Sequence, residues 1–363
     1  MATLITKNQF NPDYATHPGE VLEEILEAKG ISKVEFAQRA GLSPKTVSLI
    51  VAGIAPVTPE NAVAFEGVLG VRAEVWNNLD SNFRLFEAKR AALVASPDTM
   101  NWAKRFPLAE LASRGAIANF KDIRKAAVDL LRFFRVKDIM AWKAVYGNPV
   151  VAFRKSPTLK SSHEAVVAWL RLAEIEADSE DVGEYDTKEF KAALKDIRKL
   201  TDKDPQVFEP KMRNRCKAAG VALAFVAELP KTRLSGAASW LGTGNPMIAL
   251  SLRHKTNDHF WFTFFHEAGH ILKHGKKDIF IDEEKQGFTK EEDEANSFAS
   301  SYLIPDEEYN TFTAAKSIFL MHDVERFAKQ IGIAPGIIVG RLQHDRLIPY
   351  RRLNELKVSF KLV

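Results

Sequence analysis

Two histidines and a glutamate lie close together in the segment Phe264-Phe265-His266-Glu267-Ala268-Gly269-His270-Ile271-Leu272. On a helix, residues four apart share a face, so the rings of His266 and His270 would lie about 6 Å apart and could bind one metal ion. Glu267, one step round the helix, could accept a proton from a water molecule and pass it to a leaving group. The alternative is an amphipathic helix whose histidines are satisfied by hydrogen bonds. The motif alone leaves both open, because it is informative only in its structural context.

A catalytic zinc needs three protein ligands and one open position. Candidates for the third ligand follow in the acidic run Glu291-Glu292-Asp293-Glu294. The next residues form an apolar helical stripe of Ala295, Phe298, Ala299 and Tyr302. Glu294 lies next to this stripe and can be carried toward the histidines, with Glu291, three residues earlier, as the second choice. Alternatively, these acids only stabilise the positive end of a helix.

The residues before the histidine pair predict a small β-sheet. Apolar runs at 221–226, 235–241 and 247–252 read as strands, and the last two flank Gly242-Thr243-Gly244-Asn245-Pro246, a hairpin signal. This loop lacks the lysine and the strand-to-helix setting of a phosphate-binding loop, so it is better explained as a turn. Helices are expected over 120–136, 163–177 and 187–200, and from Pro210 to Gly220.

Residues 1–90 predict five short helices. The first begins at Pro18 and ends at Gly30, Ser32 caps the second, and the turn Gly41-Leu42-Ser43-Pro44 precedes the third. Thr58 caps the fourth helix, and the fifth follows Arg72. Two short helices joined by a turn with glycine are the helix-turn-helix pattern.

In a helix-turn-helix domain the second helix of the pair enters the major groove of DNA. The candidate DNA contacts are therefore Ser43, Lys45, Thr46 and Ser48. This set lacks the Arg, Gln and Asn side chains that best read base edges. An interaction module that no longer reads DNA is the alternative.

Residues 14–90 resemble the antitoxin-type helix-turn-helix domain of the HigA and Xre families. The resemblance is carried by His17-Pro18-Gly19-Glu20-Val21-Leu22 and by Val75-Trp76-Asn77-Asn78-Leu79. It implies operator DNA near the chain's own gene as a partner, and a neighbouring HigB-like ribonuclease toxin as a second one. A homodimer is left open.

The histidine segment is followed by Glu294-Ala295-Asn296-x-Phe298-Ala299 and a closing Leu303-Ile304-Pro305. Together these motifs resemble the ImmA/IrrE family of zinc-dependent metallopeptidases over about residues 205–345. The resemblance implies a zincin-like fold with zinc as cofactor, ligated by His266, His270 and Glu294, and Glu267 as the general base. An oxyanion stabiliser is not identified among the nearby alternatives, which are Arg253, His254, His274 and Tyr302.

A helix-turn-helix signature occurs twice. The pattern Phe-Ala-x-x-x-Gly-aliphatic-x-Pro covers residues 36–44 and again 327–335. Common ancestry and convergence on one geometry explain the repeat equally well. We expect the second unit to pack on the peptidase domain, with a second DNA contact as the alternative.

The charge is unevenly distributed. Lys and Arg number 10 against 5 Asp and Glu in residues 91–150, but 9 against 11 in residues 1–90. If nucleic acid is bound, the basic segment must help to neutralise phosphates, although a solvated helix face is its usual meaning. No apolar run reaches the roughly 20 residues that a bilayer requires. The single Cys216 excludes internal disulfides and fits a reducing cytoplasm.

We therefore expect a cytoplasmic protein that is mainly α with a small β-sheet (α+β). A five-helix helix-turn-helix domain would occupy 1–90, a helical connecting region 91–204, and a zincin-like metallopeptidase domain 205–363. The hypothesis is a DNA-binding regulator whose zinc-dependent endopeptidase hydrolyses a specific regulatory protein, with no membrane partner. One alternative is a HigA-like antitoxin and autorepressor that binds DNA and a toxin, with a structural or sensory metal domain. Another is a peptidase whose N-terminal domain only docks a partner protein.

Overall fold

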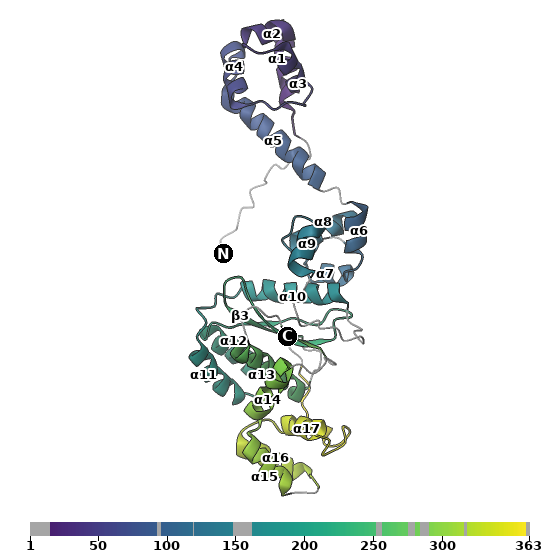
Figure 1. The fold of residues 1–363 in the computed structure, drawn as a ribbon, viewed down its shortest axis with the longest axis vertical. Helices are drawn as coiled ribbons and strands as arrows, with labels where there is room; N and C mark the ends of the chain where they lie inside the picture. The colour runs from purple at the N-terminus through teal and green to yellow at the C-terminus, as the bar shows by residue number, and fades with distance from the viewer. Residues whose placement is uncertain are drawn as a thin grey trace, which may run out of the picture. The chain divides into compact units, whose positions relative to one another are not determined.

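The computed structural model describes residues 15–92, 96–118, 120–147, 162–251, 256–274, 280–283, 290–315 and 318–360. The chain divides into two compact units, residues 1–96 and 97–363 (Figure 1). The predicted segments 91–204 and 205–363 thus both contribute to the second unit. Among the described residues, none of the helices has the length and apolarity needed to cross a membrane.

The first unit is built from five helices within its described residues, as the sequence predicts. They are α1 (Pro18–Lys29), α2 (Lys33–Arg39), α3 (Pro44–Val51), α4 (Pro59–Leu69) and α5 (Ala73–Ala92). Local caps define three of the helix starts: the side chains of Ser32, Ser43 and Thr58 each accept a hydrogen bond from a backbone N–H of the following turn. Phe36, Phe65 and Trp76 meet edge to face in the core of this unit.

The second unit begins with four short helices and three longer ones. They are α6 (Pro97–Ala103), α7 (Leu108–Ser113), α8 (Ile123–Phe133), α9 (Ile139–Tyr146), α10 (His163–Asp178), α11 (Thr187–Arg198) and α12 (Pro205–Ala218). Helix α12 starts at Pro205 instead of the expected Pro210, which lies inside it. The indole nitrogen of Trp169 in α10 donates a hydrogen bond to the carbonyl of Val226, at 2.9 Å. This bond ties the region before residue 204 to the sheet.

A four-stranded mixed sheet forms the centre of the second unit. Its strands are β1 (Ala222–Phe225), β2 (Leu234–Trp240), β3 (Pro246–Leu250) and β4 (Phe280–Glu283), in the order β1-β3-β2-β4. Strands β1 and β3 are parallel, whereas β2 pairs antiparallel with both β3 and β4. The first three strands were expected from the sequence, and β2 and β3 form the predicted hairpin.

Helices cover both faces of this sheet. Helix α10 lies on one side, and α12 and α13 (Asn257–Lys273) lie on the other (Figure 1). Because side chains alternate along a strand, Leu223, Ile248 and Leu250 all point to the α13 side, where they join the main core. The chain continues through α14 (Lys290–Leu303), α15 (Asp306–Ala314), α16 (Met321–Ile331), α17 (Pro335–His344) and the short 3-10 helix η1 (Asn354–Leu356).

Candidate metal centre

Helix α13 brings the histidine pair into the interior of the second unit. Its apolar residues, among them Trp261, Phe264 and Ala268, are fully buried against the sheet and the neighbouring helices. The side chains that could do chemistry are buried with them, since His266 is 2%, Glu267 0% and His270 1% exposed. The helical spacing predicted from the sequence is therefore present.

The two imidazoles converge on one carboxylate. The Nε2 atoms of His266 and His270 lie 3.0 Å apart. The carboxylate of Glu292, from helix α14, is 3.2 Å from the first of these atoms and 3.5 Å from the second. All three ligand atoms lie within 4.8 Å of one another, and among the described residues this is the cluster of His, Cys, Asp or Glu that could hold a metal ion.

The structure differs from the sequence prediction in the identity of the carboxylate. The expected ligand, Glu294, lies 3.3 Å from Nε2 of His274, and the second choice, Glu291, is exposed. The reason is helical register, because two residues correspond to a rotation of about 200° on an α-helix. The buried side of α14 runs through Ala295 and Ala299. Glu292 lies three residues before Ala295 and seven before Ala299, so it falls on the same side of the helix. This spacing is a signal that the sequence contained.

The outer nitrogens of both rings are held by polar neighbours. Nδ1 of His266 lies 3.0 Å from Oδ1 of Asn296, one turn after Glu292 on α14. Nδ1 of His270 lies 3.0 Å from Nδ1 of His274, which in turn contacts Glu294. Partners of this kind fix the orientation of each ring and turn Nε2 toward the metal. Glu294 therefore belongs to the surroundings of the cluster.

The environment favours a neutral His270 imidazole and an ionised Glu292 carboxylate. Burial lowers the pKa of His270 to about 4, and the hydrogen bond with Glu292 only partly offsets this effect. Burial raises the pKa of Glu292, but hydrogen bonds from His266 and His270 outweigh it, and the pKa falls to about 2. Two imidazole nitrogens and one carboxylate oxygen are the donor set of many three-ligand metal sites. The residues present therefore fit a divalent metal ion.

Glu267 lies between α13 and strand β2. Its Oε1 would be only 2.7 Å from a Cβ atom placed on Gly236 of that strand. Any larger residue at position 236 would push against Glu267 and Thr263, so glycine is needed for this close approach. No local sequence pattern indicates this pairing, which depends on how β2 packs against α13.

The expected DNA-contacting side chains lie on helix α3 of the first unit. Ser43, Lys45 and Ser48 are exposed, and Thr46 is partly buried. The hydroxyls of Ser43 and Thr46 are 2.8 Å apart, and Ser48 donates a hydrogen bond to the carbonyl of Pro44. Lys45 thus provides the positive charge on this surface.

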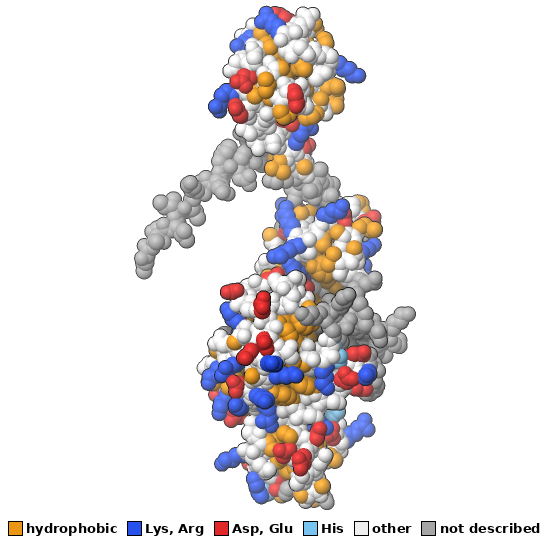
Figure 2. Space-filling view, turned by 60° about the vertical axis from the view of Figure 1, so that its left-hand side comes forward, with side chains coloured by type: hydrophobic (Ala, Val, Ile, Leu, Met, Phe, Trp, Pro, Cys, Tyr) orange, Lys and Arg blue, Asp and Glu red, His pale blue; other side chains and the backbone are white. Residues whose placement is uncertain are grey.

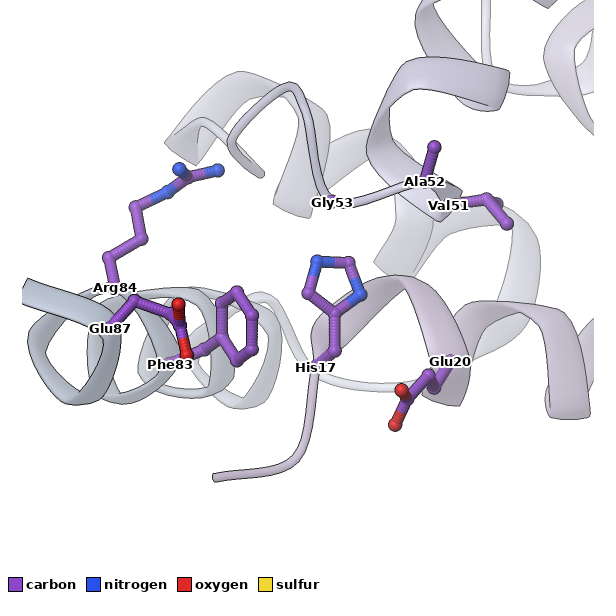
Figure 3. Close-up of a pocket in the computed structure, with 8 residues that line it drawn as sticks. All are labelled: His17, Glu20, Val51, Ala52, Gly53, Phe83, Arg84 and Glu87. Atoms are coloured by element: carbon purple, nitrogen blue, oxygen red, sulfur yellow. The ribbon is translucent and has the colours of Figure 1, made fainter. Parts of the chain in front are cut away.

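His17 supports the end of α3. Its Nδ1 accepts a hydrogen bond from the backbone N–H of Gly19, at 2.9 Å, and so caps α1. Its ring meets Phe83 of α5 edge to face, with centroids 4.5 Å apart, and points toward Gly53 just after α3 (Figure 3). The hollow at this point has a volume of about 560 Å³ and is open to solvent. His17 therefore links the start of α1, the end of α3 and the middle of α5.

Comparisons with known proteins agree with this division. A family model of the IrrE N-terminal-like domain, a peptidase family, matches residues 217–342, and a helix-turn-helix model matches residues 22–76. The helix-turn-helix-type transcriptional regulator YddM of Escherichia coli K12, described as uncharacterized, is 33% identical over 78 residues, which are 22% of this chain and 83% of YddM. The chain joins a helix-turn-helix domain to an IrrE N-terminal-like domain.

Two solved structures are similar to the helix-turn-helix domain. A protein from Nostoc punctiforme, described as an antidote of a plasmid maintenance system, is 30% identical and covers 21% of this chain and 85% of its own, with a TM-score of 0.21. An addiction module antidote protein of a HigA family from Coxiella burnetii is 26% identical with the same coverage, 21% and 85%, and a TM-score of 0.20. The two domain types expected from the sequence are confirmed by the two family models.

Within the IrrE N-terminal-like domain, the oxyanion stabiliser stays unassigned. Arg253 and His254 lie outside the described residues. His274 is engaged with His270 and Glu294, and the ring of Tyr302 stacks on Phe265 at 5.1 Å.

Proposed function

We propose that the chain is a cytoplasmic DNA-binding regulator whose IrrE N-terminal-like domain is a zinc-dependent endopeptidase for a specific regulatory protein. One observation carries the proposal. Two buried imidazole nitrogens and the carboxylate of Glu292 converge within 4.8 Å, next to the fully buried Glu267, in a domain that matches a peptidase family. A general digestive role is disfavoured, since a linked helix-turn-helix domain is typical of regulators.

We assign His266, His270 and Glu292 as the zinc ligands. When bound, zinc would supply Lewis acidity toward a water molecule and the scissile carbonyl. Glu267 accepts the proton of the attacking water and delivers it to the leaving amine, as a base beside the ligands should. Asn296 holds the ring of His266, and His274 holds the ring of His270, in each case through the Nδ1 atom of the ring that is held.

The sheet offers a place for an extended substrate. Strand β4 pairs with β2 and lies at one end of the strand order among the described strands, and β2 passes over Glu267. An extended peptide can add to such an edge through backbone hydrogen bonds. The substrate would then run along the sheet near the general base.

The helix-turn-helix domain supplies the DNA contact of the regulator. We assign this contact to the exposed face of α3, with Ser43, Lys45, Thr46 and Ser48 facing operator DNA. Because the hydroxyls of Ser43, Thr46 and Ser48 already form hydrogen bonds within the helix or its cap, Lys45 contributes most. A HigB-like toxin as partner and a homodimer remain proposals that follow from the resemblance to the HigA and Xre families.

The peptidase is tested by comparing cells that produce the unmodified chain with cells that produce Glu267→Gln. The amide keeps the shape of the side chain but cannot take the proton, so at least one protein should accumulate in the variant by quantitative mass spectrometry. Glu294→Gln is the matched control, since it removes a carboxylate outside the ligand set. Identical protein levels in all three cultures, with metal retained, would rule out the assigned mechanism.

A second candidate is an antitoxin-like autorepressor whose metal domain is structural or sensory. The deep burial of the cluster favours it, because structural metal sites are closed while catalytic sites keep an open position. In this case Glu267→Gln would leave protein levels and DNA binding unchanged, while His266→Ala would lower the thermal stability of the domain. The same cultures and purified proteins therefore distinguish the two candidates.

A further inference from the structure

Helix α8 of the second unit carries basic side chains that neither the metal centre nor α3 uses. Its buried side is formed by Ala126, Ala127, Leu130 and Phe133. Lys121, Arg124, Lys125 and Arg132 are exposed. Arg124 and Lys125 lie three and four residues after Lys121, and Arg132 lies seven residues after Lys125. These spacings place the four side chains on one side of the helix and of the turn that precedes it. We call these four residues the α8 basic face.

The acidic residues beside this face are engaged with backbone groups. Asp122 caps α8 by accepting hydrogen bonds from the N–H groups of Arg124 and Lys125, at 3.0 and 3.4 Å. Asp129 is 3.5 Å from Arg132 and also accepts a hydrogen bond from the N–H of Ala118. Their negative charge is therefore directed partly into the fold.

Several cations of helices α6 to α9 outside the α8 basic face pair with carboxylates: Arg114 with Glu110, Arg105 with Glu164 and Arg135 with Asp178. Asp138 caps α9 through the N–H of Ala141. Lys and Arg side chains are visible on the surface of this part of the chain (Figure 2). Of the 10 basic residues that stand against 5 acidic ones in 91–150, the α8 basic face brings four exposed ones together.

The helix-turn-helix unit lacks such an excess. Residues 1–90 hold 9 basic and 11 acidic residues. Several of its cations are paired with acids of the same unit, such as Lys33 with Glu23, Arg39 with Glu35 and Arg84 with Asp80. Because neutralisation of phosphates supplies most non-specific affinity for DNA, this unit alone would bind weakly.

We propose that the α8 basic face binds the phosphate backbone of nucleic acid as a second, sequence-independent contact. Arg124 and Arg132 lie about 12 Å apart along the helix axis at 1.5 Å per residue, so the face is long enough to contact more than one phosphate of a strand. The inference rests on the proposed DNA binding of the chain, and it assigns the larger share of the electrostatic attraction to α8.

The test measures binding of the full chain to operator-containing and random-sequence duplexes at several salt concentrations, by fluorescence anisotropy. The triple variant Lys121→Ala, Arg124→Ala, Lys125→Ala should weaken both duplexes alike, by about tenfold at low salt. The slope of log affinity against log salt should fall by about 2 to 3. The matched control is Lys188→Ala, Lys191→Ala, Lys195→Ala on α11, which removes the same charge from exposed positions on another surface.

The outcomes separate this inference from the proposed function. If the two triple variants weaken DNA binding equally, the effect reflects net charge alone and the inference is overturned. The inference is also overturned if the α8 variant has no effect on DNA binding. Loss of binding to phosphatidylserine vesicles with unchanged DNA affinity would assign the face to a membrane surface and also overturn it. If Lys45→Ala changes nothing while the α8 variant weakens binding, the α3 assignment fails and the inference holds. Circular dichroism of each variant verifies that the fold is retained.

Discussion

The two helix-turn-helix units, α2–α3 and α16–α17, share a sequence pattern and a geometry but not an environment. Both turns contain a glycine in the left-handed region, with φ of 66° at Gly41 and 70° at Gly332. In the pattern, Lys45 of α3 corresponds to Gly336 of α17, and Thr46 corresponds to Ile337. Lys45 is exposed, whereas Gly336 and Ile337 are buried.

The difference follows from what α17 packs against. This helix lies on α13, and Gly336 faces the side chain of Asn257 at the start of that helix. The side chains that a DNA-reading helix would expose are here replaced by small and apolar ones. The alternative of a second DNA contact through this face of α17 is therefore disfavoured, and the unit instead positions the helix that carries His266 and His270.

The largest effect is expected at the ion pair that helps to hold α13. Nζ of Lys357 lies 2.5 Å from Oδ2 of Asp258, and both side chains are largely buried. Lys357→Met should lower the free energy of unfolding by about 3 to 5 kcal/mol, since it leaves a buried carboxylate without its cation. Urea denaturation measures the loss, with Lys195→Met on the exposed face of α11 as the control.

The loss of unfolding free energy in Lys357→Met should become smaller as the pH falls. Burial raises the pKa of Asp258, but the hydrogen bonds from Lys357 and Thr256, together with the charge interactions with His259 and Lys357, outweigh it, so the folded-state pKa is lowered. The contribution of the pair is therefore complete above the ordinary Asp pKa of about 3.9, and disappears as the pH falls through the folded-state pKa. In Lys357→Met the carboxyl protonates more readily, so the difference between the proteins should shrink toward pH 4. A constant difference would show that the ion pair is not its cause.

The second prediction compares equivalent positions in the two units. A Cβ atom on Gly336 would lie 2.4 Å from Oδ1 of Asn257, which already accepts hydrogen bonds from two backbone N–H groups. Gly336→Ala should therefore cost about 1 to 3 kcal/mol and weaken metal retention, because α13 must shift. Lys45→Ala, at the matching exposed position, should leave the melting temperature unchanged. Similar melting shifts in both variants would contradict the contrast between the units.

These contrasts also show which parts of the fold and of the candidate site could be predicted from the sequence. Caps such as Ser43 and Thr58 and the spacing of His266 and His270 are local signals, so the helices of the first unit and the histidine pair could be predicted. The proposed third ligand is a weaker signal, because Glu292 and Glu294 differ only in the face of α14 that they occupy. The spacing from Ala295 and Ala299 indicates the face of Glu292, and packing against α13 buries it. The approach of Glu267 to Gly236 also depends on contacts between distant residues, which no local pattern specifies.

The smallest effect is expected on the exposed unit itself. Lys45→Ala with Thr46→Ala should lower operator affinity by about three- to tenfold and leave the stability unchanged, because both side chains contribute little to the core. Anisotropy titrations with operator and random duplexes measure the change. The corresponding change in α17, Ile337→Ala, should reduce stability but not DNA affinity. If the α3 variant binds operator DNA with unchanged affinity, the DNA contact lies elsewhere.

The metal content of the purified chain tests the central claim most directly. Elemental analysis by mass spectrometry should find about one zinc per unmodified chain, and little or none in His266→Ala or Glu292→Gln, which lose a ligand. Glu294→Gln should retain the metal with an affinity lowered by about tenfold, since it only removes a partner of His274. No metal in the unmodified chain, or loss in Glu294→Gln with retention in Glu292→Gln, would contradict the account.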